Sequence, residues 1–310
     1  MFRVLSYNIW VGGVGRVEAL TKIMRLDHPD IVGLVEATNV QIVVELSRKL
    51  SLSHYWISGQ AAHEEDWQVA ILSRFPIVGT PEIHNRAHEP LTNLTKPCLE
   101  VSIELPDKEQ VTIFVAHLFA DFHSSAGNKT RKKEIQELVQ IMRRKRGTPH
   151  ILMGDFSAVA PGERLKGSNL LRYVSGLQQE YNENQEAFLE PPSMSYIIPS
   201  PLDKFSPFLK IVPKSRFLSQ CFDLVTNLIR APHANLALLY KEGYIDCFRK
   251  KNPRAEGLTA PTVALAARLD YIFASPELEN RLLSCSVIER AEDIKGEKAS
   301  DHLPVLAEFQ

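Results

Sequence analysis

The amino-acid sequence predicts an α+β fold in which two β-sheets pack together and helices flank them. The first observation is a series of short apolar segments spread along the 310 residues. Several alternate apolar with polar residues, as strands with one buried face do, and others are continuous runs typical of interior strands. The second observation is that a few helical patterns lie between these strands. Many strands with few helices are typical of a two-sheet sandwich.

The elements follow one another along the whole chain. Predicted strands cover residues 2–9, 31–36, 67–72, 99–105, 111–118, 150–155, 269–274, 285–289 and 304–309. Predicted helices cover residues 17–26, 39–50, 129–144 and 235–242. Asn39 is placed to cap the second helix, whose apolar residues follow at helical spacing. The chain has no internal repeat, so we expect a single domain over residues 1–310.

Residues 161–231 interrupt this alternation. Prolines gather in the stretch PPSMSYIIPSPLDKFSPFLKIVP, and they predict no long regular element in the region 161–231. Apolar residues such as Met194, Tyr196 and Phe205 are too frequent for a disordered linker. We therefore predict a folded insertion at about 161–231. Its role stays open between a flap that packs on the body and a wall beside the substrate.

The charge balance and the N-terminus limit the class of protein. Thirty-six basic against 37 acidic residues give a net charge of −1, whereas proteins that bind long nucleic acid are normally basic. A nucleic-acid partner is left open but not favoured. No segment approaches the ~20 apolar residues of a membrane span, and the chain begins as a strand rather than a signal peptide. We expect a cytoplasmic protein without an obligate protein partner, with peripheral lipid contact left open.

The four cysteines lie far apart in apolar surroundings and form no CxxC pair. This pattern predicts buried, reduced thiols rather than a disulfide framework or a thiolate metal site.

Acidic and amide side chains recur at the ends of the apolar strands. A carboxylate at the end of a buried strand is costly unless it is paired or ligated. Oxygen ligands of this kind suit Mg²⁺ or Mn²⁺, which complete their shell with water and substrate phosphate. A histidine beside such a cluster could act as acid, base or anion stabiliser. The residues are Asn8, Glu36, Asp155, Asp270, Asp301 and His302.

Seven ordered motifs extend this pattern: SYNIW, DIVGLVEAT, VAILSRFPI, FVAHLFAD, ILMGDFSAV, RLDYIFAS and SDHLPVLAEF. They resemble the motifs of the endonuclease/exonuclease/phosphatase superfamily, which includes deoxyribonuclease I, abasic-site endonucleases and neutral sphingomyelinases. The resemblance covers nearly the whole chain. It implies a four-layer αββα sandwich of two mainly antiparallel sheets flanked by helices, with its site at one edge. It also implies hydrolysis of a phosphoester by in-line attack of water, dependent on Mg²⁺ or Mn²⁺.

The resemblance also implies a role for each matching position. Glu36 would be the principal metal ligand, and Asp301 and Asn8 would lie beside the same ion. His302 would contact the scissile phosphate, and Asp270 would hydrogen-bond His302 and fix its tautomer.

Three further positions complete the implied site. Asp155 would orient or deprotonate the attacking water, and His117 would contact phosphate or assist the leaving group. Abasic-site endonucleases commonly have tyrosine at the position of His117, so the histidine favours the deoxyribonuclease-like and sphingomyelinase-like branches. Ser157 departs from the family, because the usual motif is GDFN or GDLN and this chain reads GDFS. Serine has one donor proton where the asparagine amide has two.

The function predicted from these residues is that of a metal-dependent phosphodiesterase or phosphatase acting on a small or lipid-like substrate. The first alternative is an endonuclease or DNA-repair nuclease, for which the basic segment at residues 129–147 is the distinctive support. The second alternative is a catalytically weakened binding module, which Ser157 suggests.

Overall fold

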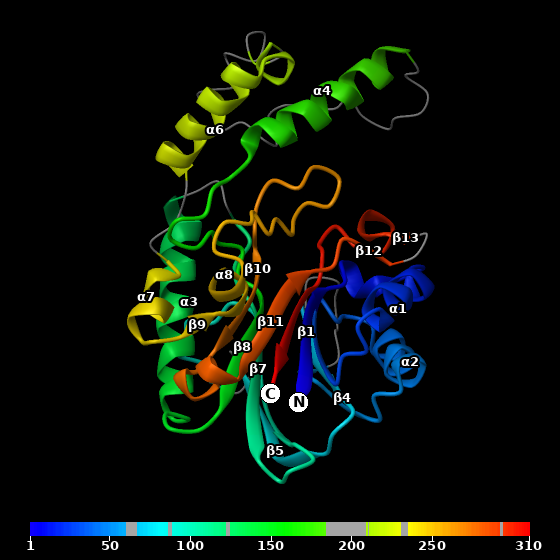
Figure 1. Ribbon diagram of the computed structural model, residues 1–310, viewed down its shortest axis with the longest axis vertical. Coiled ribbons are helices and arrows are strands. Elements are labelled where there is room, and N and C mark those ends of the chain that lie inside the picture. The colour runs from blue at the N-terminus through cyan, green and yellow to red at the C-terminus, as the bar shows by residue number, and fades with distance from the viewer. Residues whose placement is uncertain are drawn as a thin grey trace.

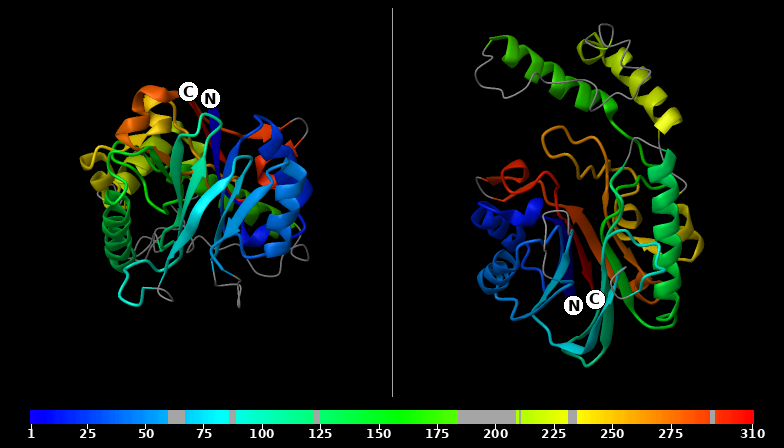
Figure 2. Two further views of the ribbon diagram at one scale, coloured as in Figure 1. Left: turned by 90° about the horizontal axis from the view of Figure 1, so that it is seen from below. Right: turned by 180° about the vertical axis from the view of Figure 1, so that it is seen from behind.

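Two six-stranded sheets pack face to face, and helices cover the outer face of each sheet, in the computed structural model of the protein (Figures 1 and 2). The structure describes residues 1–59, 67–85, 89–121, 125–183, 209, 211–230, 235–291 and 294–310. The predicted α+β sandwich with helices on both outer faces is confirmed.

Each sheet combines strands that are distant in the sequence, and the spatial order of its strands differs from their chain order. The first sheet contains, in spatial order, β11 (Leu282–Val287), β14 (Val305–Phe309), β1 (Phe2–Asn8), β2 (Ile31–Val35), β4 (Val69–Ser73) and β3 (His54–Ile57). The second sheet contains β5 (Ile77–His84), β6 (Cys98–Glu104), β7 (Gln110–His117), β8 (His150–Asp155), β10 (Asp270–Ala274) and β9 (Ile245–Asp246). A separate two-stranded ribbon contains β12 (Arg290–Ala291) and β13 (Ile294–Lys295).

The helices lie in the connections between these strands. The α-helices are α1 (Val17–Arg25), α2 (Val40–Leu50), α3 (Ser125–Arg143), α4 (Gly167–Glu183), α6 (Arg216–Arg230), α7 (Ala237–Lys241) and α8 (Cys247–Lys251). Short 3₁₀ helices are η1 (Val11–Gly13), η5 (Val212–Lys214), η6 (Pro276–Arg281) and η7 (Gly296–Lys298). The predicted cap of α2 is confirmed, since the side chain of Asn39 accepts a hydrogen bond from the backbone N–H of Ile42.

Each sheet contains one parallel strand pair among antiparallel neighbours. In the first sheet β1 runs parallel to β2, and in the second β7 runs parallel to β8. Because the carboxyl ends of parallel strands meet at one edge of a sheet, Asn8 lies level with Val35 and His117 lies level with Asp155. Strand β10 runs antiparallel to β8 and begins opposite Asp155. One edge of the sandwich therefore gathers the ends of all five strands.

Side-chain alternation separates three layers of core. Alternate residues of both sheets, among them Val4, Ile31, Val115 and Ile151, fill the space between the sheets. The intervening residues pack under α1 and α2 on one side and under α3 and α7 on the other. A Cβ at Gly33 would lie 2.4 Å from the Cε atom of Met153, so glycine there permits the close approach of the two sheets.

Two helices correct the expectation for residues 161–231. Helices α4 and α6 are long regular elements on either side of the proline-rich stretch, so the predicted absence of such elements is wrong for them. Ser168 on α4 joins the two helices, because its backbone N–H and its hydroxyl donate hydrogen bonds of 2.7 and 2.9 Å to the Asp223 carboxylate on α6. Figure 1 shows the pair beyond the end of the sheets at which β1 ends. Residues 184–208, 210 and 231, which hold most of the predicted insertion's prolines, lie outside the described residues.

Two further expectations concern the cysteines and membrane-spanning segments. The cysteines are free thiols, and Cys98, Cys247 and Cys285 are buried as predicted, whereas Cys221 on α6 is exposed. Among the described residues, no helix has both the length and the apolar character required to span a membrane.

Candidate active site

The inter-sheet core ends in polar side chains at the edge where the parallel strands end. The alternation that points Val4, Ile113 and Ile151 between the sheets also points Asn8, His117 and Asp155 there. Asp270, at the start of β10, lies directly opposite Asp155. All four polar side chains are buried. The sequence places them there because each is the last or first member of an inward-facing series.

Asp155 lies at the centre of the site. Its Oδ1 atom accepts a hydrogen bond from the backbone N–H of Ser157 at 2.7 Å, and its Oδ2 atom accepts one from the Asn8 amide at 3.2 Å. The Nε2 atoms of His117 and His302 both lie 3.7 Å from Oδ2. Burial alone would raise the pKa of Asp155, but the charge of His302 and its other neighbours holds the pKa below its ordinary value. The carboxylate is therefore ionised at neutral pH.

His302 forms an ion pair with Asp270. Its Nδ1 atom lies 2.8 Å from Asp270 Oδ2, and Asp270 is almost completely buried. Burial would lower the pKa of His302, but the facing carboxylates of Asp270 and Asp155 raise it to about 10. The imidazole is therefore a cation at neutral pH, with Nε2–H directed towards Asp155. This geometry presents a fixed positive charge to an anion bound at the edge of the sandwich.

Glu36 and Asp301 form an acidic pair beside Asn8. The Glu36 carboxylate accepts hydrogen bonds from the Asn8 amide at 3.1 Å and the Val11 backbone N–H at 2.8 Å. Ser300, next to Asp301, donates a hydrogen bond to the Asn8 carbonyl oxygen at 2.7 Å, which links the two sides. Burial raises the pKa of both Glu36 and Asp301. Neither carboxylate has an ion pair within the described part of the chain.

This donor set fits a hard divalent cation. Each oxygen of Glu36 accepts only one hydrogen bond among the described residues, so lone pairs remain for a ligand bond. Two carboxylates and an amide are the ligand types that Mg²⁺ and Mn²⁺ prefer. Asp155, Asp270 and His302 also bring possible ligand atoms within 4.8 Å of one another. In that group, however, His302 is protonated and already paired with Asp270, and a protonated imidazole has no lone pair for a metal.

Residues 5–302 match the sequence model of the Endonuclease/Exonuclease/phosphatase family. The chain belongs to the endonuclease/exonuclease/phosphatase family. Members of this family are phosphoester hydrolases that generally use divalent metals, and the protein is accordingly a hydrolase of phosphoric esters. No match was found among curated protein sequences.

Solved structures of the same fold include an endonuclease/exonuclease/phosphatase from Beutenbergia cavernae, at 17% identity and a TM-score of 0.64, over 100% of this chain and 71% of that one. An AP endonuclease from Archaeoglobus fulgidus matches at 16% identity and a TM-score of 0.61, over 100% of both chains. A 3′ phosphatase from Neisseria, bound to product DNA hairpin, matches at 18% identity and a TM-score of 0.60, again over 100% of both chains. At these identities the comparison establishes the shared fold.

The site residues expected from the sequence lie together in the structure. Direct contacts connect Asn8, Glu36, Asp155, Asp270 and His302 into one group. The remaining three positions border it: Ser157 through Asp155, His117 through Asp155, and Asp301 through Ser300.

Lys96 and Trp67 are neighbours of the site that the sequence did not predict. Lys96 Nζ lies 2.7 Å from His117 Nε2 and 5.3 Å from the centre of the Trp67 ring. The Trp67 ring also makes an edge contact with His117. The signal in the sequence is a lysine two residues before the apolar strand β6.

Left-handed backbone conformations gather in the same region. Trp10, Val11, Glu36 and Ser157 all have positive φ values, between 43° and 59°. Residues other than glycine rarely adopt this conformation, and such strain is concentrated at functional sites in proteins. These turns follow the ends of β1, β2 and β8, and they direct the Val11 N–H to Glu36 and the Ser157 N–H to Asp155.

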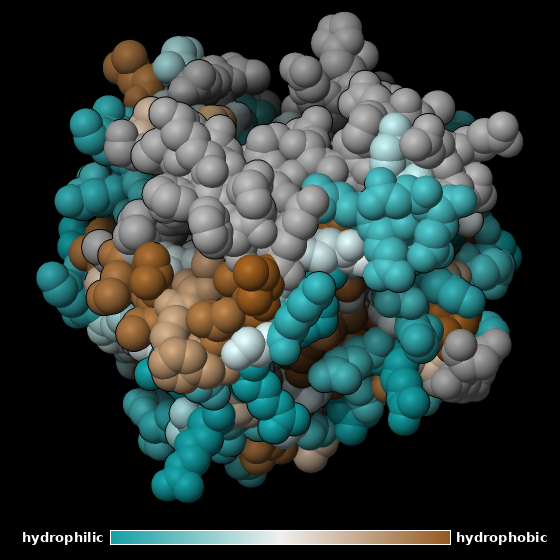
Figure 3. All heavy atoms as spheres, turned by 90° about the horizontal axis from the view of Figure 1, so that it is seen from above, coloured by the Kyte–Doolittle hydropathy of each residue, from teal (hydrophilic) through white to brown (hydrophobic). Residues whose placement is uncertain are grey.

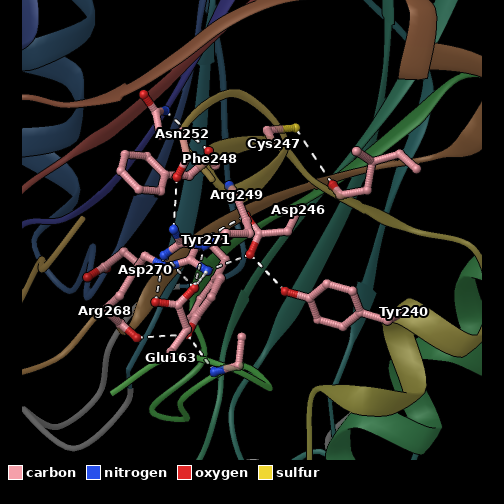
Figure 4. Close-up of polar contacts among 12 residues, drawn as sticks. Glu163, Tyr240, Asp246, Cys247, Phe248, Arg249, Asn252, Arg268, Asp270 and Tyr271 are labelled. Atoms are coloured by element: carbon pink, nitrogen blue, oxygen red, sulfur yellow. Dashed lines mark hydrogen bonds and ion pairs between the residues drawn. The ribbon is translucent and has the colours of Figure 1, made fainter. Parts of the chain in front are cut away.

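A buried ion network holds the chain segment that precedes Asp270 (Figure 4). The Arg268 guanidinium, 1% exposed, donates hydrogen bonds to Asp246 at 2.9 Å and Glu163 at 2.6 Å. It also lies over the Tyr271 ring, 4.3 Å from its centre. Arg249 donates two further hydrogen bonds to Glu163. The network fixes the start of β10, and with it the position of Asp270.

Changing Ser157 to asparagine is expected to raise kcat/KM about fivefold, the value of roughly one additional hydrogen bond. Ser157 has a φ of 43°, which asparagine adopts more readily than serine, so the free energy of unfolding should not fall. Steady-state kinetics and urea denaturation measure both effects. Ser157→Ala is the matched control, and it should be slower than wild type. A kcat/KM of Ser157→Asn at or below the wild-type value would contradict the expectation.

Proposed function

We propose that the protein hydrolyses a small or lipid-like phosphoester by in-line attack of water at this site. The observation that carries the proposal is the Asp155 carboxylate, ionised and placed between two imidazoles at the edge of the sandwich. Asp155 orients the attacking water and accepts its proton. The His302 cation, held by Asp270, faces the negative charge of the phosphoryl oxygens.

Glu36 and Asp301 would hold the divalent cation, with the Asn8 amide positioning the Glu36 carboxylate. When bound, Mg²⁺ or Mn²⁺ would act as a Lewis acid that lowers the negative charge on the phosphoryl oxygens. The Asn8 amide also donates a hydrogen bond to Asp155, so it contacts both the proposed metal ligand Glu36 and the proposed base. This shared contact supports a single site that combines metal binding with water activation.

A small substrate is supported by a cleft that Thr262 links to Asp301. The cleft, of about 490 Å³, lies between α4 and the 262–265 turn, and Tyr173, Leu177 and Val263 are among its lining residues. This volume is ordinary for a small-molecule site. Thr262 joins the turn to the site, because its backbone N–H donates to the Asp301 carbonyl oxygen at 2.8 Å.

A lipid-like substrate is supported by exposed apolar side chains near this end of the molecule. On α6, Phe217, Leu224 and Leu228 are each more than 60% exposed. In Figure 3, apolar side chains gather on the side of the upper face on which α6 lies in Figure 1. Such a patch is typical of a surface that contacts an apolar partner. Sphingomyelin vesicles are therefore included in the substrate panel.

The nuclease alternative has support from the named neighbours, one of which is an AP endonuclease and another a DNA-bound 3′ phosphatase. The basic segment of the sequence gives it less support than its composition suggests. Helix α3 packs on the outer face of the second sheet, and the basic residues at its C-terminal end have acidic partners. Arg143 pairs with Glu242, while Arg144 and Lys145 both pair with Glu100. These acidic partners reduce the charge available to a polyanion.

A substrate panel separates these functions. We expect metal-dependent hydrolysis of bis-p-nitrophenyl phosphate and of either a small phosphoester or sphingomyelin, with slower cleavage of plasmid and abasic duplex DNA. Faster cleavage of DNA, with affinity that falls steeply with salt, would establish the nuclease alternative instead. Failure to hydrolyse every substrate, with activity appearing in Ser157→Asn, would identify a weakened binding module.

Removal of the metal is expected to abolish hydrolysis, and Mg²⁺ or Mn²⁺ should restore it. Changing Glu36 to glutamine removes one negative charge from the acidic pair, so its Mn²⁺ dissociation constant should rise at least about tenfold. Titration calorimetry measures this binding without reference to activity. Glu297→Gln, at an exposed position, is the matched control and should bind Mn²⁺ as wild type does. Unchanged Mn²⁺ affinity in Glu36→Gln would exclude Glu36 as a ligand.

A further inference from the structure

The ammonium group of Lys96 is held at the edge of the site by contacts from two directions. It donates hydrogen bonds to His117 Nε2 at 2.7 Å and to the Leu118 carbonyl oxygen at 3.2 Å. The Trp67 ring lies beside it, 5.3 Å away, which favours a cation at this position. An ammonium has three N–H donors. Two therefore have acceptors within the described residues, and one remains for a ligand.

The contact with Lys96 determines the state of His117. Because Nε2 accepts a hydrogen bond from Lys96, the ring proton lies on Nδ1. Nδ1 is buried and has no hydrogen-bond partner among the described residues. Burial and the charge of Lys96 lower the pKa of His117 to about 3. His117 is therefore a neutral acceptor, and the positive charge on this side of the site belongs to Lys96.

Lys96 lies close to Asp155, because its partner atom His117 Nε2 is 3.7 Å from Asp155 Oδ2. The carboxylates that act on it electrostatically are Asp155 at the end of β8, Glu36 after β2 and Glu134 on α3. Glu134 is already occupied by Thr95 and by the Phe119 backbone N–H. Asp155 and Glu36 belong to the proposed water-activating and metal-binding groups. Lys96 thus borders the space in which a phosphoester would lie.

We propose that Lys96 is a catalytic residue that contacts an oxygen of the phosphoester through its free N–H, and that His117 is the positioning residue that orients the ammonium. This inference rests on the proposed function and extends it. An ammonium so placed stabilises the negative charge that develops on the phosphoryl group. It accounts for a buried histidine that carries no charge of its own. It also places one fixed cation on each side of Asp155, Lys96 with His117 on one and His302 on the other.

The test compares Lys96→Met and Lys96→Arg with wild type. We expect Lys96→Met to lose about 10²-fold in kcat/KM, as when one donor to a developing oxyanion is removed. Lys96→Arg keeps the charge and should recover at least tenfold of that loss. Lys145→Met is the matched control, since Lys145 pairs with Glu100 outside the site and should leave kcat/KM unchanged.

Two further measurements distinguish a catalytic from a structural role. Calorimetry with Mn²⁺ should show the same metal affinity in Lys96→Met as in wild type, whereas inorganic phosphate should bind the Mn²⁺-loaded variant at least tenfold more weakly. Burial lowers the pKa of Lys96 to about 8, so wild-type kcat/KM should fall above that pH and Lys96→Arg should retain its rate to higher pH.

Two results would overturn the proposal. Wild-type kcat/KM and wild-type phosphate affinity in Lys96→Met would exclude the contact. Loss of Mn²⁺ affinity together with activity would show that the lysine supports the metal-binding group instead. If wild type hydrolyses no substrate, the proposed function fails, but weaker phosphate binding in Lys96→Met would still support an anion contact at Lys96.

Discussion

Replacing Asp155 with asparagine is expected to lower kcat by about 10³-fold, because the site would lose its base and its central negative charge. Asp155 accepts hydrogen bonds from Ser157 and Asn8 and lies 3.7 Å from both His117 and His302. Asparagine has nearly the same shape but cannot accept a proton from water. KM should change far less than kcat, since substrate binding depends on the surrounding cations and the metal-binding carboxylates.

The kinetic measurement needs proof that the variant is folded. Circular dichroism and urea denaturation provide it, and Mn²⁺ calorimetry shows whether Glu36 and Asp301 remain in place. The matched control is Asp107→Asn, an exposed turn residue remote from the strand ends that form the site, which should retain wild-type kcat. Wild-type kcat in a folded Asp155→Asn variant would exclude Asp155 as the base.

Replacing Arg268 with methionine is expected to lower the free energy of unfolding by about 3–5 kcal/mol, the usual consequence of removing one partner of a buried ion network. Methionine keeps much of the side-chain volume, so the loss is chiefly electrostatic. Glu163 and Asp246, both buried, would lose their shared cation, although Arg249 would still contact Glu163. Urea denaturation followed by circular dichroism measures the change.

Arg143→Met is the matched control for this prediction. Arg143 also donates two hydrogen bonds to a carboxylate, that of Glu242, but its side chain is half exposed. Solvent-exposed pairs contribute little to stability, so this variant should lose far less free energy of unfolding than Arg268→Met. Equal losses in the two variants would show that burial of the Arg268 network does not strengthen it.

The strands that bear the site could be predicted from the sequence because their apolar series are long and end in polar residues. Several short or edge strands could not, and β5 and β3 show why. Strand β5 contains Gly79 and Pro81, which favour turns, and its register with β6 shifts between Val78 and Glu82. Strand β3 has only four residues, two of them exposed, so its pattern lacks a buried face. Both depend on pairing with a neighbouring strand.

Helices α4 and α6 were not predicted for a different reason. Their sequences have helical spacing, but the prolines between them dominated the prediction for the whole segment. The contacts of Ser168 with Asp223 and of Leu165 with Asn227 join residues more than 50 positions apart. A pattern within a short window of sequence cannot reveal pairs at this separation.

The candidate site shows the same division. Glu36, Asp155 and His302 could be predicted because each stands beside a strand signal and belongs to a recognisable motif. Lys96 belongs to no motif, and its environment is set by Trp67 and by His117, which ends β7 and is 21 residues away. Its proposed role therefore depends on contacts that exist only in the folded protein, and no local sequence pattern predicts it.

Because the site is divided between the two sheets, the activity of this enzyme depends on how the sheets pack together. Strands β1 and β2 bring Asn8 and Glu36 from the first sheet, while β7 and β8 bring His117 and Asp155 from the second. Neither sheet alone carries both the acidic pair and the base. A slight parting of the sheets, with every strand still hydrogen-bonded, would disconnect the Asn8 amide from Asp155. Turnover should therefore disappear at lower denaturant than the far-ultraviolet circular dichroism signal, and its loss would register the docking of the two sheets.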